Sequence, residues 1–362
     1  MKIVDVQALP LAVPLAEMSF HSSLATRLAT QIVVKVLSDD GTTGIGEAAS
    51  ARGAPLAVCH IIENGVKPYL IGEDPTQIER LMNKIFRHTF SYTRRGLGLF
   101  AISGIEIALW DLVGKMRGLP VAALLGGPSE TKVRAYASLL RYERPEEVAE
   151  VAQAYVDRGF TAMKLHQIDV ESVRVVRKAV GDNIELMLDV NCAWSPLEAI
   201  RKIKEFEELN LRWIEEPVWP PEDYRGLAEV AASVDVPIAA GENESTCYGF
   251  RELIAQKSVD ILQPSLCRVG GLLEGKKICH LASTWNLTVV PHVFWLGAGM
   301  AAAAHFVAST PECLFVEYPA VDLQEEFLID PPRPQDGFLK ISHNPGLNLE
   351  LNEEVVKCYS VT

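Results

Sequence analysis

The sequence contains no CxxC pair, and its seven cysteines are an odd number spread along the chain. This pattern argues against a disulfide framework and against paired-cysteine metal or redox motifs, and it indicates reduced, mostly buried thiols in a cytosolic protein. Basic residues are scarce, with 34 against 47 acidic ones and a net charge of −13. Nucleic acids and anionic membranes bind basic patches, so neither is an expected partner.

Long apolar runs are also missing. No run of about 18 apolar residues occurs, so we expect no membrane span. The N-terminal stretch MKIVDVQALPLAVPL has an aspartate within its apolar part and two prolines, and it resembles a β-strand more than a signal peptide. With 48% hydrophobic and 22% charged residues, the 362-residue chain has the composition of a globular protein with a large core.

What is present is a regular repeat. Short apolar runs end in a polar or charged residue every 23 to 27 residues. These end residues are Lys164 with His166, Asp189, Glu215, Glu242, Ser265, His292 and Glu317. A strand, a reactive residue at its C-terminal end and a helix-length segment, repeated, is typical of a β/α barrel whose strand ends meet at one mouth.

The chain before the repeat has a different pattern. Residues 2–9, 31–37 and 43–48 predict an antiparallel sheet, and helices are expected over 55–67, 75–88 and 100–117. From residue 133 onward, eight strands alternate with helices up to about residue 320. We therefore expect an α+β domain in 1–125 and an α/β barrel in 126–319. Residues 337–351 predict two short strands, and 320–362 are expected to return to the first domain.

Three carboxylates end consecutive predicted strands: Asp189, Glu215 and Glu242. Neighbouring strand ends lie close together in a barrel, and three bare carboxylates would repel one another. A hard divalent cation resolves that repulsion, and carboxylate oxygens suit Mg²⁺. Each carboxylate could instead cap the helix that follows it, but three in register favour a metal site. Asn191 lies beside Asp189 and could bind substrate or support the site.

Proton carriers flank these carboxylates. Lys164 and His166 are two residues apart on one strand, so both side chains would face the mouth. His292 lies across the barrel on the seventh strand. A base and an acid on opposite sides of one substrate suit proton abstraction followed by reprotonation or elimination. Glu317 on the eighth strand could accept a hydrogen bond from a substrate hydroxyl or help complete the charge environment of the site.

The motifs resemble those of the enolase superfamily, in its mandelate racemase / muconate lactonizing enzyme family and mandelate racemase-like subgroup. The resemblance rests on these segments: Lys164, Asp189-Val-Asn191, Trp213-Ile-Glu-Glu-Pro217, Gly241-Glu242-Asn243, Pro291-His292, Gly44-Ile-Gly-Glu47 and Gly270-Gly271. It implies a (β/α)7β modified TIM barrel under an α+β cap, with Mg²⁺ on the three carboxylates. It also implies abstraction of the proton α to a metal-bound substrate carboxylate, and a homo-oligomer.

Two residues depart from the pattern of the family. The usual Lys-x-Lys pair is Lys164-Leu-His166, and the aspartate that normally pairs with the strand-seven histidine is Ser265. A serine cannot act as a charged partner of His292, but its hydroxyl can orient the ring. We therefore expect Lys164 or His166 to remove the α-proton and His292 to act mainly as an acid. An acid that helps a β-hydroxyl leave favours dehydration over racemisation.

The substrate is left open. His21, Arg27 and Arg52 lie on predicted lid loops and could bind hydroxyls or a distal carboxylate, although surface loops often carry such residues. The apolar stretch 293–297 argues against a pocket lined for a long polyol. A sugar acid, a smaller hydroxy acid and a cyclic amino acid all fit.

Three functions are compatible with these residues. The first is a Mg²⁺-dependent lyase that dehydrates a 2,3-dihydroxy carboxylate such as a sugar acid, and the second is a racemase or epimerase at the α-carbon. The third is a non-catalytic barrel kept as a binding protein, which the intact Lys164 and the three carboxylates argue against.

Overall fold

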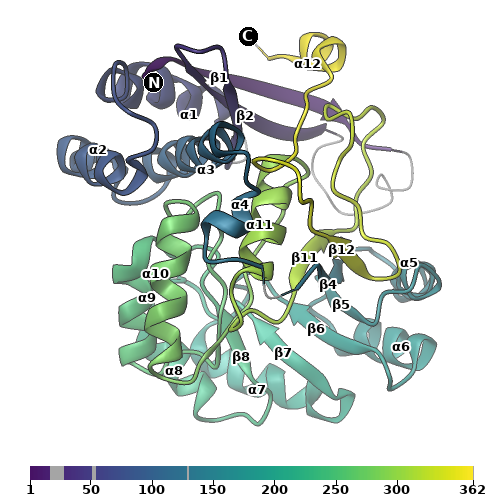
Figure 1. Cartoon of the computed structure of the whole chain (residues 1–362). Helices are drawn as coiled ribbons and strands as arrows, with labels where there is room; N and C mark the ends of the chain where they lie inside the picture. The colour runs from purple at the N-terminus through teal and green to yellow at the C-terminus, as the bar shows by residue number, and fades with distance from the viewer. Residues whose placement is uncertain (17–27, 51–53, 129, 362) are drawn as a thin grey trace.

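The computed structural model describes residues 1–16, 28–50, 54–128 and 130–361 (Figure 1). The three candidate substrate-binding residues of the lid loops, His21, Arg27 and Arg52, lie outside these ranges. The molecule has a three-stranded antiparallel sheet with helices at the top of Figure 1 and a parallel barrel below it.

The N-terminal sheet consists of β1 (Ile3–Pro14), β2 (Leu28–Ser38) and β3 (Thr43–Ala48), in that order. Three helices cover it: α1 (Pro55–His60), which continues into short π and 3₁₀ turns up to Tyr69, α2 (Ile78–Thr93) and α3 (Leu97–Arg117). These elements bury a hydrophobic cluster of their own. The expected α+β capping fold is confirmed.

Helix α3 is the centre of this cap. By length and composition it could cross a membrane, but 83% of its apolar window is buried inside the protein, as in the core helix of a soluble domain. It packs directly on β3, because a Cβ on Gly46 would lie 2.2 Å from the carbonyl oxygen of Gly104. The short helix α4 (Val121–Leu124) lies between α3 and the first strand of the barrel.

The barrel strands run parallel and follow one another around the curved sheet. They are β4 (Lys132–Ser138), β5 (Ala162–Leu165), β6 (Glu185–Asp189), β7 (Leu211–Glu215), β8 (Ile238–Ala240), β9 (Ile261–Leu262), β10 (Thr288–Val289) and β11 (Val316–Pro319). β11 pairs with β4, so the path of the sheet runs from β10 through β4 to β11. A bridge between Val289 and Cys313 joins the two ends.

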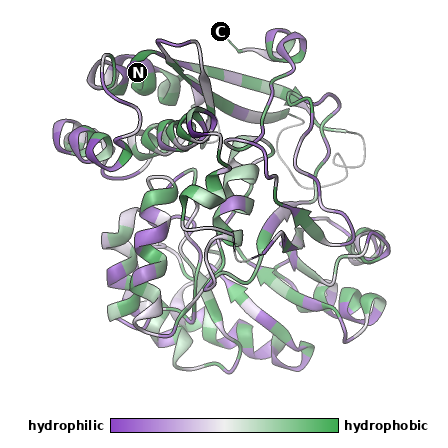
Figure 2. Ribbon diagram, in the orientation of Figure 1, coloured by the Kyte–Doolittle hydropathy of each residue, from purple (hydrophilic) through white to green (hydrophobic). Residues whose placement is uncertain are grey.

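Helices connect the strands and cover the outside of the barrel. They are α5 (Pro145–Asp157), α6 (Val170–Val180), α7 (Pro196–Phe206), α8 (Tyr224–Ala231), α9 (Thr246–Ala255), α10 (Leu272–Ser283) and α11 (Ala298–Ala308). In Figure 2 most of them carry both green and purple stretches, as expected of helices with one buried face. The predicted eight-stranded β/α barrel is confirmed.

The barrel interior is filled by side chains below the strand ends. Tyr136, Trp213 and Phe315 belong to one buried cluster, with ring centroids 6.0 to 6.3 Å apart. This aromatic layer closes the barrel from below. The reactive residues of the strand ends therefore open toward the cap.

The C-terminal segment forms one strand where the sequence predicted two. β12 (Phe338–Lys340) pairs with the barrel strand β4, and α12 (Glu353–Tyr359) packs against β1 of the cap. The second predicted strand does not form, because the backbone of this region bonds elsewhere. Gly346 exchanges hydrogen bonds with Leu119 and Val121, and Leu347 donates to Asp111.

Candidate active site

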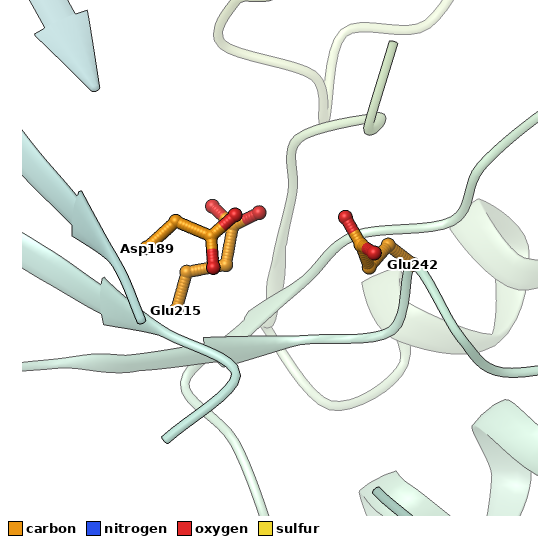
Figure 3. A group of neighbouring side chains, drawn as sticks. All are labelled: Asp189, Glu215 and Glu242. Atoms are coloured by element: carbon orange, nitrogen blue, oxygen red, sulfur yellow. The ribbon is translucent and has the colours of Figure 1, made fainter. Parts of the chain in front are cut away.

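Three carboxylates converge at the C-terminal ends of β6, β7 and β8. Asp189 and Glu215 are paired in register on neighbouring strands, and Glu242 follows β8 by two residues. Each offers one oxygen within 4.8 Å of the others (Figure 3). The three side chains are buried or nearly so, and a compact set of hard oxygen donors of this kind fits a divalent cation such as Mg²⁺.

Glu215 accepts hydrogen bonds on both oxygens. Trp213 Nε1 and Gln263 Nε2 donate to Oε2 over 3.2 and 2.7 Å, and Lys164 Nζ lies 2.8 Å from Oε1. Burial raises the pKa of Glu215 to about 7, although Lys164 opposes this shift. The carboxylate is therefore fixed in orientation, and burial together with the neighbouring carboxylates outweighs the charge of Lys164.

Asp189 is oriented by its own loop. The backbone N–H and the side-chain amide of Asn191 donate to Oδ1 over 2.8 and 3.0 Å. Asn191 adopts a φ of 49°, which folds the chain back over the end of β6. Asn191 was predicted to bind substrate or to support the site, and in the structure its amide donates to Asp189. Its contact with substrate stays a prediction.

Lys164 and His166 both reach Asp189, as expected for residues two apart on a strand. Lys164 Nζ is 3.6 Å and His166 Nε2 is 3.2 Å from Asp189 Oδ2. Lys164 also contacts Glu215 and Glu317 over 2.8 and 2.9 Å. Burial alone would lower the pKa of Lys164, but the surrounding carboxylates raise it well above its usual value.

A backbone carbonyl group fixes the orientation of the His166 ring. Its Nδ1 lies 2.5 Å from the carbonyl oxygen of Leu139, which can only accept a hydrogen bond. Nδ1 therefore carries a proton, and Nε2 faces Asp189 and the mouth of the barrel. Arg141 donates to the carbonyl of His166 and holds its backbone.

His292 lies on the opposite side of the triad. Its Nε2 is 2.8 Å from Glu242 Oε2, and its Nδ1 is 3.1 Å from the hydroxyl of Ser265. Burial lowers the pKa of His292, but Glu242 and Glu317 outweigh it and raise the pKa above its usual value. Ser265 was predicted to orient this ring, and the two residues also form a backbone bridge.

Glu317 joins the two sides of the site. Its Oε1 contacts Lys164 over 2.9 Å, and its Oε2 accepts a hydrogen bond of 2.7 Å from the N–H of Val293, next to His292. The side chain is fully buried. Glu317 was predicted to accept a bond from substrate or to help complete the charge environment, and in the structure its oxygens contact Lys164 and the N–H of Val293. Its contact with substrate stays a prediction.

Two residues of the site were missed in the sequence. Gln263 supports Glu215, and Arg268 lies 3.2 Å from Glu242 Oε1. Gln263 precedes Ser265 by two positions, so the period of a strand places both side chains on one face and could have revealed it. Arg268 is in a loop without a period, and no local signal marks it.

Comparisons with known proteins agree with this geometry. The model of the mandelate racemase / muconate lactonizing enzyme N-terminal domain matches residues 3–126, and the enolase C-terminal domain-like model matches residues 147–355. The D-galactarolactone cycloisomerase of Agrobacterium fabrum is 33% identical, over 90% of this chain and 90% of the relative. The D-xylonate dehydratase of Haloferax volcanii is 33% identical, over 91% and 85% respectively.

Solved structures give the same result. The 3,6-anhydro-D-galactonate cycloisomerase from Zobellia galactanivorans superposes with a TM-score of 0.91 at 32% identity, covering 100% of both chains. A racemase from Streptomyces coelicolor A3(2) with bound magnesium superposes with a TM-score of 0.90 at 26% identity, covering 99% of this chain and 100% of that one. With both of its halves matched, this chain belongs to the mandelate racemase / muconate lactonizing enzyme family of the enolase superfamily.

Proposed function

We propose that this protein is a Mg²⁺-dependent lyase that dehydrates an acid sugar or a smaller hydroxy acid. The reaction removes the proton α to the substrate carboxylate and then eliminates water from the β-carbon. The observation that carries the proposal is the triad of carboxylates with Lys164 and His166 on one side and His292 on the other. Relatives named as D-xylonate and arabinonate dehydratases support the same class of reaction.

Mg²⁺ is the proposed cofactor, held by Asp189, Glu215 and Glu242. When bound, it supplies a positive charge that holds the substrate carboxylate and stabilises the negative charge left by the departing α-proton. Side chains of the protein transfer the protons and supply further charge stabilisation. Lys164 adds a second cation on the side of the triad opposite His292.

His166 is the proposed base. Its Nδ1 is committed to the carbonyl of Leu139, so Nε2 is the atom that takes up a proton. Lys164 is the alternative base, but its side chain is fully buried and contacts three carboxylates, those of Asp189, Glu215 and Glu317. We therefore assign electrostatic stabilisation to Lys164.

His292 is the proposed acid. Its pKa is raised by Glu242 and Glu317, and Nε2 is the ring atom that faces the triad. A proton delivered from Nε2 to the β-hydroxyl lets it leave as water. Ser265 holds the other ring nitrogen and so keeps Nε2 directed toward the substrate.

An isomerase is the second candidate. Proton carriers on both sides of the triad also suit removal of the α-proton from one face and its return to the other. A structural neighbour named as a racemase supports this class. Analysis of products separates the two, because dehydration of a 2,3-dihydroxy acid yields a 2-keto-3-deoxy acid, whereas inversion at the α-carbon yields an epimer and no keto acid.

The direct test is a screen of sugar acids and hydroxy acids for 2-keto acid formation with and without Mg²⁺. We expect one group of substrates to yield a 2-keto-3-deoxy acid, only with metal. Asp189→Asn should abolish it, and Glu185→Gln, at the far end of the same strand, should retain it. An epimerised product without a keto acid would replace the proposal with the isomerase.

The roles of the acid and the base need a separate test. Exchange of the α-hydrogen is followed in D₂O with a substrate analogue that cannot eliminate. We expect His166→Ala to abolish exchange and His292→Ala to retain it. Loss of exchange in His292→Ala, with exchange kept in both His166→Ala and Lys164→Ala, would contradict the assignment.

The domain boundaries and the setting of the protein are further parts of the proposal. We propose a capping domain in 1–125, with 320–362 returning to it, and a catalytic barrel in 126–319. The separate core of the cap and the contact of α12 with β1 support this division, while β12 stays with the barrel. We further propose a cytoplasmic homo-oligomer that binds a small carboxylate and neither nucleic acid nor membrane.

A further inference from the structure

Glu47 of the cap reaches into the barrel. It lies on β3 in the segment Gly44-Ile-Gly-Glu47, and it is fully buried. Its Oε2 accepts hydrogen bonds from the backbone N–H groups of Gly297 and Gly299, over 3.2 and 2.9 Å. These two groups lie at the start of α11, which begins at Ala298. A cap carboxylate therefore holds the N-terminus of a barrel helix.

The held segment is the loop that follows the proposed acid. Gly297 follows His292 by only five positions in the sequence. At the near end, the N–H of Val293 donates to Glu317 over 2.7 Å, and at the far end the loop is held by Glu47. The loop is thus fixed at both ends by carboxylates, one from the barrel and one from the cap.

The fit between Glu47 and this loop is tight. A Cβ on Gly297 would lie 3.0 Å from Glu47 Oε2 and 2.9 Å from the ring of Phe327. Gly299 is also enclosed, because its Cβ would lie 2.9 Å from the side chain of Trp295. Trp295 in turn stacks on the guanidinium of Arg268 at 5.5 Å. A shift at Gly297 would therefore be transmitted along the loop toward His292 and Arg268.

Burial of the Glu47 carboxylate lowers the stability of the fold. Its Oε1 is buried without a hydrogen-bond partner among the residues that the structure describes. A buried carboxylate with an unpartnered oxygen destabilises the fold, so such a group calls for an explanation other than packing. Holding the two N–H groups at the start of α11 supplies one, because the helix terminus carries partial positive charge.

We propose that Glu47 is a positioning residue for His292, and that the cap sets the geometry of the acid through the loop 293–299. This inference rests on the proposed role of His292. The contact of the cap with the barrel therefore also fixes the position of the His292 ring. The role of Glu47 in the reaction is then indirect, through its hydrogen bonds to Gly297 and Gly299.

The first test measures the NMR signal of the His292 ring and requires no substrate. The chain has eight histidines, so labelling with [¹³Cε1]-histidine gives a simple spectrum, and His292→Ala assigns the signal. We expect Glu47→Ala to shift and broaden the His292 signal, and Glu47→Gln, which keeps an acceptor oxygen, to restore it. A His292 signal unchanged in folded Glu47→Ala would overturn the proposal.

The matched control is Asp111, another buried carboxylate of the cap. It accepts hydrogen bonds from the N–H groups of Ile45 and Leu347, both over 2.7 Å, and it does not contact the loop 293–299. Asp111→Ala should destabilise the protein and leave the His292 signal in place. Equal changes in Asp111→Ala and Glu47→Ala would mean that general loosening of the cap is the cause, and would also overturn the proposal.

The second test measures turnover. We expect Glu47→Ala to lower kcat at least tenfold per folded molecule, with KM and Mg²⁺ affinity within about twofold, and Glu47→Gln to keep most of kcat. A Glu47→Ala kcat equal to that of Asp111→Ala would count against the proposal. A wild-type protein that turns over no carboxylate would refute the proposed function, while the His292 signal would still decide whether Glu47 positions the ring.

Discussion

At the scale of single residues, the site depends on groups that orient the carboxylates. Asp189 is held by Asn191, Glu215 by Trp213 and Gln263, and Glu242 by Arg268 and His292. Such supporting hydrogen bonds keep a ligand in the geometry that its metal requires. Gln263 gives the clearest case, because it is uncharged and is fully buried against Glu215.

Replacing Gln263 by leucine should weaken Mg²⁺ binding tenfold to hundredfold, the usual range for a lost supporting partner of a ligand. The side chain keeps its approximate volume but can no longer donate to Glu215 Oε2. Titration calorimetry measures the affinity. The control is Ser258→Ala, which removes a hydrogen bond from another fully buried polar side chain, to the carbonyl of Tyr224. Unchanged affinity in Gln263→Leu would show that Trp213 and Lys164 suffice.

Ser265 gives a second prediction at this scale. Ser265→Ala removes the hydroxyl 3.1 Å from His292 Nδ1. A hydrogen bond of this kind contributes about 1 kcal/mol, so we expect kcat to fall by up to about tenfold. Mg²⁺ affinity should stay constant, because Ser265 contacts His292 and none of the three carboxylates. A kcat equal to that of wild type would mean that Glu242 alone orients the ring.

At the scale of elements, the cap and the barrel are joined by carboxylates at helix termini. Glu106 on α3 accepts hydrogen bonds from the N–H groups of Leu272 and Leu273, over 2.8 and 2.9 Å, at the start of α10. Glu47 does the same at the start of α11. Both carboxylates lie close to glycines of the barrel loops, since a Cβ would lie 2.0 Å from Glu106 Oε2 at Gly271 and 3.0 Å from Glu47 Oε2 at Gly297.

Gly271→Ala should therefore destabilise the protein by about 3 kcal/mol or more. A Cβ at Gly271 would lie 2.0 Å from Glu106 Oε2, and the φ of +91° adds strain for any other residue. Gly72→Ala is the control, because Gly72 has a similar φ of +82° with nothing within 4 Å of its Cβ. It should cost only the strain of about 1 kcal/mol. Urea unfolding compares the two, and equal losses would mean that strain alone matters.

Features set by local patterns could be predicted from the sequence, and features set by contacts between distant residues could not. The barrel was predictable because each strand–helix unit repeats a local pattern, and the strand ends fixed where Asp189, Glu215 and Glu242 would meet. Arg268 was not predictable, because its contact with Glu242 depends on the path of a loop. The course of the C-terminal segment also escaped, because Leu347 bonds to Asp111, 236 positions away in sequence.

At the scale of the whole molecule, we expect the stability supplied by the cap–barrel contacts of Glu47 and Glu106 to depend on pH. Burial raises the pKa of both Glu47 and Glu106 from 4.5 to about 7, although backbone N–H groups oppose the shift. In the unfolded chain both carboxyls lose their protons near pH 4.5. Between about pH 4.5 and 7 the folded protein therefore binds more protons than the unfolded one, and the contribution of these groups to stability falls as pH rises.

The double variant Glu47→Gln/Glu106→Gln isolates this effect, because glutamine stays neutral at every pH and still offers an acceptor oxygen. From pH 5 to pH 8, wild type should lose roughly 2 kcal/mol per group relative to the variant. Urea unfolding at pH 5, 6.5 and 8 measures the difference, in which all other titrating groups cancel. A difference that does not change with pH would mean that both carboxyls keep the same charge in the folded and unfolded states. The two helix contacts would then be made by carboxylates that are ionised in both states, and they would have no pH dependence between pH 5 and 8.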